Sequence, residues 1–333
     1  MFLLNFTQIF IEKVSKICYC AFGTFFIYLM LNDYQLKGSI TMITLQNQQL
    51  TVQIDELGAQ LHSIKRQDNE IEYLWQGDPA SWNRQAPILF PFVGRLKDDQ
   101  YQYSNQTYHQ TQHGFARDRK FQVIEQTPSM VVMEQHDDSE TKKAFPFSFS
   151  LQVKFELVVD KVEISYAVKN PSGDETLIYA IGAHPGFNMP LTGAGSFEQT
   201  ELSVKPATEY SRIVLDGAYN DSTHPQLIDM RDSLSLNHDL FNKDAIIFKT
   251  DGGHFTAKLT DTVANHGVIV DTFNTEYVGV WSQYPSTAPF VCVEPWWGIA
   301  DNVNADGLLL HKQGMHRLAP NETDNYHFSI KPF

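Results

Sequence analysis

The sequence predicts an all-β protein whose body is one large antiparallel β-sandwich. Three observations lead to this fold class. Apolar and polar residues alternate with a period of two along most of the chain. Turn-forming clusters of Gly, Pro, Asn and Asp separate the alternating segments. Helical spacing is scarce, because only residues 78–82 and the stretch after residue 232 permit a turn or two. Many short strands with frequent turns are typical of sandwiches.

Residues 1–41 differ in composition from the rest of the chain. Residues 17–31 form an apolar run without charge that is shorter than the ~20 residues of a membrane-spanning helix. No small-residue cleavage site follows it cleanly. The sequence leaves three interpretations open: an upstream or disordered leader, a membrane anchor, or an export signal. Since the strand pattern begins at Met42, we expect one functional domain at residues 42–333, with no membrane contact of its own.

The strands are expected in the following order. An alternating segment starts at Leu50 and ends before a turn at Gly58. The clearest alternation covers residues 147–157 and then 162–168, so these two segments predict an antiparallel hairpin with one buried face. Further short strands are expected at 119–126, 129–136, 176–182, 254–260, 267–272, 277–283 and 289–294.

Composition narrows the choice of partners. The formal net charge of −14 repels phosphate backbones, which excludes nucleic acid as a partner. Aromatic residues make up 13% of the chain and supply flat faces for stacking on a ligand. The three cysteines cannot form a disulfide framework, which favours a reducing compartment and therefore a cytoplasmic location.

Two polar motifs interrupt the apolar pattern in the first half of the chain. Arg95 ends the motif FPFVGR, where a guanidinium can point into a cleft. Its alternative role is a surface ion pair with Asp98 or Asp99. His113 begins the motif HGFAR at an expected strand-to-loop junction, and its alternative role is a histidine bonded to backbone.

Two more motifs follow in the second half. His184 lies in GAHPGF, where Pro185 should end the strand and the flanking glycines leave the imidazole accessible. Glu294 lies in FVCVEPWWG, at the expected end of an apolar strand that Pro295 should terminate. A carboxyl group beside two indoles should have a raised pKa, as a general base near neutral pH requires. Its alternative role is an ion pair with an arginine at the rim.

Motifs for cofactors, metals and covalent catalysis are absent from the sequence. It contains no phosphate-binding GxxxxGK[ST], no dinucleotide GxGxxG opening a helix, no HExxH and no GxSxG. We therefore expect neither a cofactor nor a metal. Histidines and a carboxylate at strand ends suit proton transfer instead.

The four motifs, in this order and spacing, resemble the aldose 1-epimerase (galactose mutarotase) family over residues 42–333. The similarity is strongest to the branch associated with bacterial lactose operons. The resemblance implies a galactose mutarotase-like supersandwich and interconversion of the anomers of a hexose. It also implies Glu294 as general base, His184 as general acid, and substrate contacts from Arg95, His113, Asp244 and Trp297.

The sequence departs from the galactose mutarotases after the first histidine. Phe115-Ala116-Arg117 follows Gly114, a pattern similar to the hexose-6-phosphate epimerases of the same superfamily. The partner is therefore a small sugar, either a hexose or a hexose phosphate, and Arg95, Arg117 and Arg119 are candidates to bind the phosphate. A carbohydrate-binding module and a glycoside hydrolase that uses two carboxylates are the alternatives.

Overall fold

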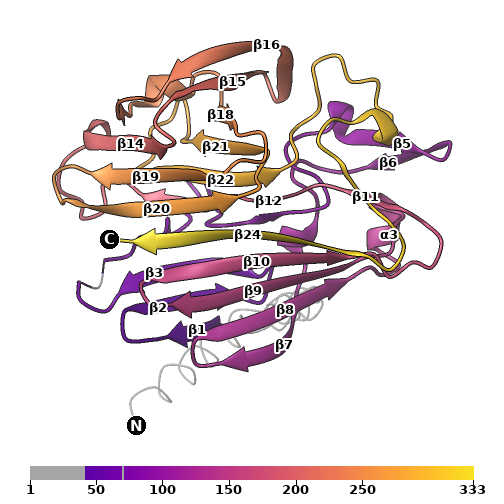
Figure 1. Ribbon diagram of the computed structural model, residues 1–333, viewed down its shortest axis with the longest axis horizontal. Coiled ribbons are helices and arrows are strands. Elements are labelled where there is room, and N and C mark those ends of the chain that lie inside the picture. Colours follow the sequence, from indigo (N-terminus) through magenta and orange to yellow (C-terminus); the bar gives the residue numbers. More distant parts are fainter. Residues whose placement is uncertain (1–41, 70) are drawn as a thin grey trace, which may run out of the picture. The chain divides into compact units, whose positions relative to one another are not determined.

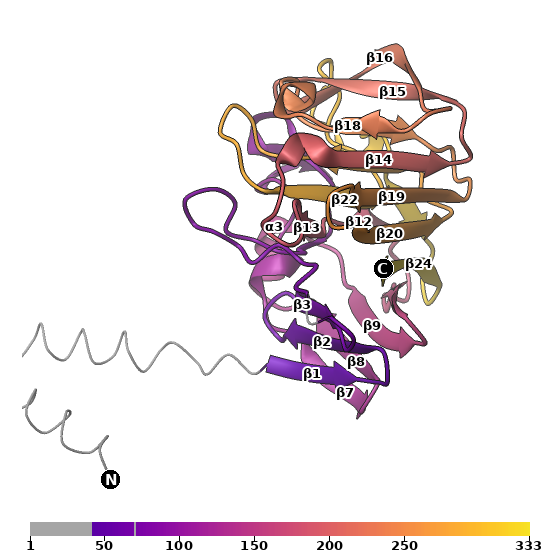
Figure 2. The same cartoon turned by 90° about the vertical axis from the view of Figure 1, so that its left-hand side faces the viewer.

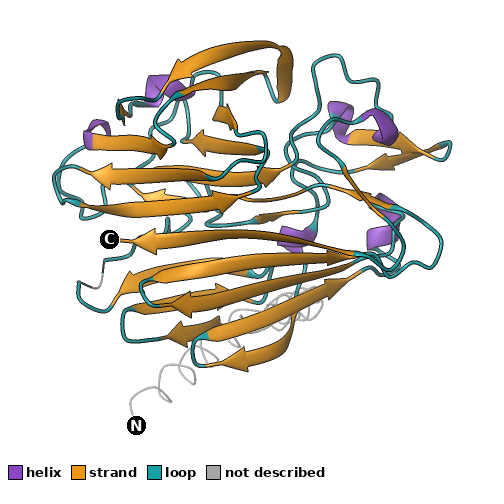
Figure 3. Cartoon of the chain, viewed as in Figure 1, coloured by secondary structure: helices purple, strands orange, loops and turns teal. Residues whose placement is uncertain are grey.

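The computed structural model describes residues 42–69 and 71–333. Nearly all of their regular secondary structure is β-strand, which confirms the all-β prediction (Figure 3). Within this part of the chain the α-helical structure is the single turn α3 (Thr141–Ala144). Short 3₁₀ turns lie at Lys97–Asp99, Ala116–Asp118, Phe197–Gln199, His238–Phe241 and Leu309–His311. None of the described helices is long and apolar enough to cross a membrane. The expectations for residues 1–41 fall outside the described residues.

Two large antiparallel sheets dominate the described part (Figures 1 and 2). The first sheet has nine strands: β17 (Leu234–Ser235), β14 (Thr200–Lys205), β19 (Phe255–Asp261), β20 (His266–Phe273), β24 (Thr323–Pro332), β10 (Lys161–Lys169), β9 (Ser150–Val158), β8 (Met130–His136) and β7 (Gln122–Thr127). The second has eight strands: β16 (Tyr219–Asp229), β15 (Glu209–Asp216), β18 (Ile246–Lys249), β21 (Tyr277–Trp281), β22 (Phe290–Trp297), β12 (Ile181–Ala183) and β4 (Ile88–Leu89), with β13 (Gly186–Asn188) also paired to β22.

Three smaller sheets complete the described fold. They are β1 (Met42–Gln46), β2 (Leu50–Asp55) and β3 (Gln60–Arg66); β5 (Gln100–Tyr103) and β6 (Gln106–His109); and β11 (Leu177–Tyr179) and β23 (His316–Leu318).

The predicted hairpin of residues 147–168 is confirmed as β9 and β10, with Leu157 opposite Val162. Alternate residues of both strands are buried, because one face of each strand packs in the main core. β9 begins at Ser150, three residues later than its alternation suggested, yet Phe147 and Phe149 are buried just before it. The alternating pattern therefore identified the buried side chains correctly but placed the start of the paired strand too early.

The prediction that Pro295 terminates its strand is wrong. β22 continues through Pro295 to Trp297, and Pro295 lies opposite Val278 of β21. On its other side β22 pairs with β13 up to Cys292 and with β12 from Trp296 onward. Pro295 lies in the gap between these two partners, where the missing N–H breaks no ladder hydrogen bond.

The eight-stranded sheet buries side chains on both faces. On β22, Val291, Val293 and Trp297 belong to the main core cluster, which also contains residues of the nine-stranded sheet. The intervening residues, including Cys292, Glu294 and Trp296, therefore point to the opposite face. This second face carries the candidate site.

Candidate active site

A cavity of about 410 Å³ lies against this second face of the eight-stranded sheet. Its floor includes Glu294 and Trp296 of β22, and its wall includes Trp82 and Trp281. Apolar surface with a few convergent polar groups is the usual character of a small-molecule site. The remaining polar groups of the lining are Asn83, Arg84, Gln112, His113, Arg117, His184 and Asp244.

Glu294 and His184 meet at the floor of this cavity. His184 Nε2 lies 3.1 Å from Glu294 Oε2, and both side chains are almost completely buried. Within residues 42–69 and 71–333, neither Glu294 Oε2 nor His184 Nδ1 has a hydrogen-bond partner. The short contact between His184 Nε2 and Glu294 Oε2 is not aligned as a hydrogen bond. Both atoms are therefore unsatisfied groups in the described protein.

His184 is positioned by the break in its strand. As predicted, pairing stops after β12 at Ala183 and resumes at Gly186 in β13, which leaves His184 and Pro185 between them. The Pro185 carbonyl still accepts a hydrogen bond from Val293 N–H at 3.1 Å. This bond fixes the loop one residue away from Glu294, so the imidazole and the carboxyl are held together by backbone pairing.

Aromatic rings enclose the His184 imidazole. Trp82 stacks on it with ring centroids 4.9 Å apart and an interplanar angle of 28°, and Trp281 meets it edge-on at 5.7 Å. Burial lowers the pKa of His184 to about 3, with Arg117 and Arg84 adding a smaller effect. Burial likewise raises the pKa of Glu294, helped by the negative charge of Asp244 and opposed by the Trp296 indole. Together these shifts favour one proton on the pair, resting on the carboxyl group.

His113 faces the same space from a strained turn. Its φ is +70°, and Gly114 follows with a φ of +73° at a point where a Cβ would lie 2.2 Å from the Phe90 carbonyl oxygen. Only glycine fits at the second position. The Gly94 N–H donates to His113 Nδ1 at 3.1 Å, so the neutral ring carries its proton on Nε2. Burial keeps the pKa of His113 well below its ordinary value, and nearby His184 adds to this.

Asp244 also lines the cavity, as its predicted role requires. Its φ is +65°, and its side chain is exposed toward the cavity. The surrounding protein still desolvates the carboxyl, which raises its pKa, while the Ala245 N–H opposes the shift. The structure therefore brings Glu294, His184, His113 and Asp244 together around one cavity.

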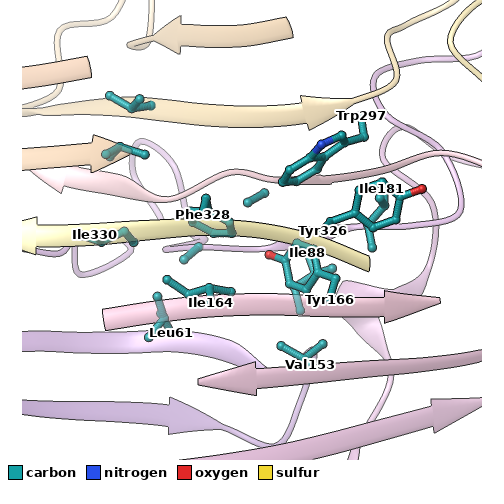
Figure 4. Packing of buried hydrophobic residues seen from close by; sticks show 14 of the residues in the cluster. Leu61, Ile88, Val153, Ile164, Tyr166, Ile181, Trp297, Tyr326, Phe328 and Ile330 are labelled. Atoms are coloured by element: carbon teal, nitrogen blue, oxygen red, sulfur yellow. The ribbon is translucent and has the colours of Figure 1, made fainter. Parts of the chain in front are cut away.

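The structure corrects the assignment of Trp297 to the substrate site. Trp297 is 2% exposed and packs in the main core against Tyr166 and Tyr326 (Figure 4). Trp296 lines the cavity instead, because side chains alternate along β22 and Trp296 shares a face with Glu294. The alternation with a period of two that predicted the strands also indicates which of the two tryptophans shares a face with Glu294.

The predicted contact between Arg95 and the substrate is also corrected by the structure. It does not line the cavity, and its Nε lies 3.5 Å from Asp99 Oδ1, which was the alternative role considered for it. Arg119 pairs with Asp138 outside the cavity. Of the three arginines proposed to bind a phosphate, Arg117 alone lines the cavity, and Arg84 joins it there.

Comparison with known proteins identifies the family. Residues 41–331 match the family model described as aldose 1-epimerase. This chain belongs to the aldose 1-epimerase family. Protein LacX of Lactococcus lactis subsp. lactis is 31% identical over 302 residues, which cover 86% of this chain and 98% of that protein.

Two solved structures are similar to this aldose 1-epimerase family member over nearly their whole length. A galactose mutarotase related enzyme from Lactobacillus acidophilus is 38% identical, with a TM-score of 0.86 over 88% of this chain and 97% of that one. A galactose mutarotase-like protein from Lactobacillus casei is 31% identical, with a TM-score of 0.80 over 88% and 100%. The predicted galactose mutarotase-like fold is thereby confirmed.

Several cavity residues of this family member were not predicted from the sequence. Trp82 and Arg84 lie in an irregular segment before β4, where no periodic pattern indicates a direction for a side chain. Trp281 ends β21, so its place depends on the pairing of that strand with β22. Composition offered one signal, since this protein has five tryptophans and three of them line the cavity.

Proposed function

We propose that this protein is an aldose 1-epimerase that interconverts the α and β anomers of a hexose, with residues 42–333 as its functional unit. The observation that carries the proposal is the contact of 3.1 Å between His184 and Glu294 at the floor of a cavity with aromatic walls. A buried acid–base pair suits a reaction that moves two protons and needs no redox centre.

The chemistry assigns a role to each member of the pair. Mutarotation removes the proton of the C1 hydroxyl while another proton is added to the ring oxygen. In the form with the proton on His184, the Glu294 carboxylate accepts the hydroxyl proton and the imidazolium protonates the ring oxygen. The ring opens, the C1–C2 bond rotates, and the aldehyde recloses on its other face with the two roles reversed. The pair has the same total number of protons before and after each turnover.

Binding of the sugar supplies a hydrogen bond to the carboxyl group of Glu294. A sugar hydroxyl can donate to Oε2 of Glu294, which no described residue hydrogen-bonds. This bond stabilises the carboxylate and moves the shared proton to His184. His113 donates from Nε2 toward the ring oxygen, and Asp244 accepts from a hydroxyl. The Trp296 indole offers a flat face for the C–H groups of the sugar.

Arg117 supports a second candidate substrate, a hexose phosphate. Its side chain is largely buried, and its Nη2 donates to the Gln112 carbonyl at 2.7 Å. Its Nε lies 3.7 Å from Asp118 Oδ2 and has no hydrogen-bond partner among the described residues. Burial lowers the pKa of Arg117 to about 10, and Arg84 contributes to the shift. Two guanidinium groups at one end of a cavity suit a dianion, since their forks bind phosphate oxygens in pairs.

A sugar-panel assay tests both candidates. Anomer exchange of glucose, galactose and their 6-phosphates is measured by NMR, with Arg117→Ala and with Arg95→Ala as a control outside the cavity. For a hexose phosphate, kcat/KM exceeds that for the free sugar and falls selectively in Arg117→Ala. Equal kcat/KM values that Arg117→Ala leaves unchanged refute the phosphate candidate. Failure to exchange any sugar refutes the epimerase and favours a carbohydrate-binding module, whereas release of reducing sugar from a glycoside indicates a hydrolase.

A further inference from the structure

A third side chain with ligand chemistry lies beside the acid–base pair and has no role in the proposed mechanism. Cys292 precedes Glu294 by two residues on β22, so both point to the same face of the sheet. One ligand atom from each of Cys292, His184 and Glu294 lies within 4.8 Å of the other two. All three side chains are buried.

The backbone holds these three groups in place. Cys292 is opposite Gly186 in the pairing of β22 with β13, and Gly186 follows His184 by two residues. A Cβ added at Gly186 would lie 3.3 Å from the Cys292 sulfur, so the thiol is packed directly under the turn that carries the imidazole. The donors therefore converge without a flexible loop, which is how preformed metal sites are built.

The donor set is selective in its chemistry. A sulfur, an imidazole nitrogen and a carboxylate oxygen together suit Zn²⁺, whereas Mg²⁺ and Ca²⁺ prefer oxygen ligands alone. Oε2 of Glu294 has no hydrogen-bond partner within the described part of the chain, so it is free to coordinate. Glu294 and His184 also line the cavity, which leaves a fourth position for water on the open side.

We propose that Cys292, His184 and Glu294 form a Zn²⁺ site that inhibits the protein. A bound ion occupies the carboxylate and the imidazole at once and prevents both from exchanging protons with a sugar. Binding displaces the thiol proton and the proton shared by the pair, and no electrons are transferred. The inhibitory effect depends on the proposed epimerase function, but the binding site does not.

Zinc and cobalt binding by the full chain tests the site directly. Cys18 and Cys20 are replaced by Ser in every sample, because they are the other two thiols of the chain. We expect about one Zn²⁺ per chain by equilibrium dialysis, and a thiolate-to-metal charge-transfer absorption with Co²⁺. Cys292→Ala should remove the absorption and weaken Zn²⁺ binding at least ~10-fold, since one of three protein ligands is lost.

Activity in the same samples tests the inhibition. Zn²⁺ should suppress anomer exchange when Cys292 is present, a chelator should restore it, and Cys292→Ala should keep basal turnover while resisting Zn²⁺. Cys292→Ser serves as the isosteric control for packing. Equal Zn²⁺ affinity with and without the thiol, or a Co²⁺ spectrum without the charge-transfer band, would overturn the proposal. If the protein exchanges no sugar, the proposed epimerase function fails. Zn²⁺ binding that depends on Cys292 would still establish the metal site, so the two proposals are tested separately.

Discussion

Single residues of the site depend on the direction in which a strand presents them. Glu294 and His184 could be chosen from the sequence because each is a polar residue that stands between an apolar segment and a proline. Trp297 was chosen wrongly because adjacent residues of a strand point to opposite faces, and a motif of two tryptophans does not say which one faces the ligand. Extending the alternation from Glu294 by two residues would have identified Trp296.

The two tryptophans provide a matched pair of variants. Trp296→Phe should lower kcat/KM about 3- to 10-fold, because an aromatic contact contributes roughly 0.5–1.5 kcal/mol. Trp297→Phe should leave KM nearly unchanged and lower the free energy of unfolding by about 1–3 kcal/mol, because it shrinks a core side chain. Anomer-exchange kinetics and chemical denaturation measure the two effects. The opposite pattern would return Trp297 to the substrate site.

At the scale of elements, the sequence predicted where strands occur but not where one strand ends and the next begins. The segment predicted as one strand at 176–182 is divided between β11 and β12, which belong to different sheets. The long hairpin of β15 and β16 was not predicted, because much of it is exposed and lacks regular alternation. The irregular segment that carries Trp82 and Arg84 is positioned by tertiary contacts alone, so sequence patterns could not place it.

Two glycines on neighbouring strands make room for the Trp296 indole. A Cβ at Gly279 of β21 would lie 2.9 Å from the Trp296 ring, and a Cβ at Gly182 of β12 would come equally close. Because these strands flank β22, the indole lies flat over both of them. This arrangement fixes one side of the cavity floor.

Gly279→Ala tests the role of this floor. The added methyl group should destabilise the fold by about 1–3 kcal/mol through overpacking and should lower kcat/KM by displacing Trp296. Gly173→Ala is the control, because a Cβ there meets no atom of the described residues within 4 Å and the φ is not positive. The control should be neutral or slightly stabilising. Equal stability and activity of both variants would show that the indole does not depend on Gly279.

At the scale of the whole molecule, the sandwich also keeps an ionisable group partly buried outside the site. Glu72 accepts hydrogen bonds from Ile64 N–H at 2.9 Å, from Leu74 N–H at 3.0 Å, and from the Ser63 hydroxyl. Burial nevertheless raises the pKa of Glu72 above its ordinary value. The folded state therefore binds this proton more tightly than the unfolded state does.

This linkage predicts how stability depends on pH. The stabilisation from the Glu72 proton is fully present below the unfolded pKa near 4.5 and is lost as pH rises through the higher folded pKa. The free energy of unfolding of Glu72→Gln, relative to the native protein, should therefore increase between about pH 4 and pH 7. Glu322→Gln, at an exposed carboxylate, controls for the loss of one negative charge. Denaturation curves across this range measure the difference, and a flat or falling difference contradicts the assignment.

The central claim is that Glu294 and His184 act as one acid–base unit. His184→Asn should reduce kcat about as much as Glu294→Gln does, because each variant removes one of the two proton-transfer groups. The double variant should be little worse than either single variant, since groups that act as a unit have non-additive effects. Multiplicative losses would mean that the two residues act independently.

Anomer exchange by Glu294→Gln, measured by NMR on the best sugar of the panel, tests this claim most directly. The substitution preserves the size of the side chain and removes the base, so kcat should fall at least ~100-fold. Sugar affinity should change far less, and the unfolding temperature should stay equal or rise, because the replaced carboxyl is buried and its Oε2 has no hydrogen-bond partner among the described residues. Retention of more than about a tenth of native turnover by a folded Glu294→Gln protein would contradict general-base catalysis by this residue.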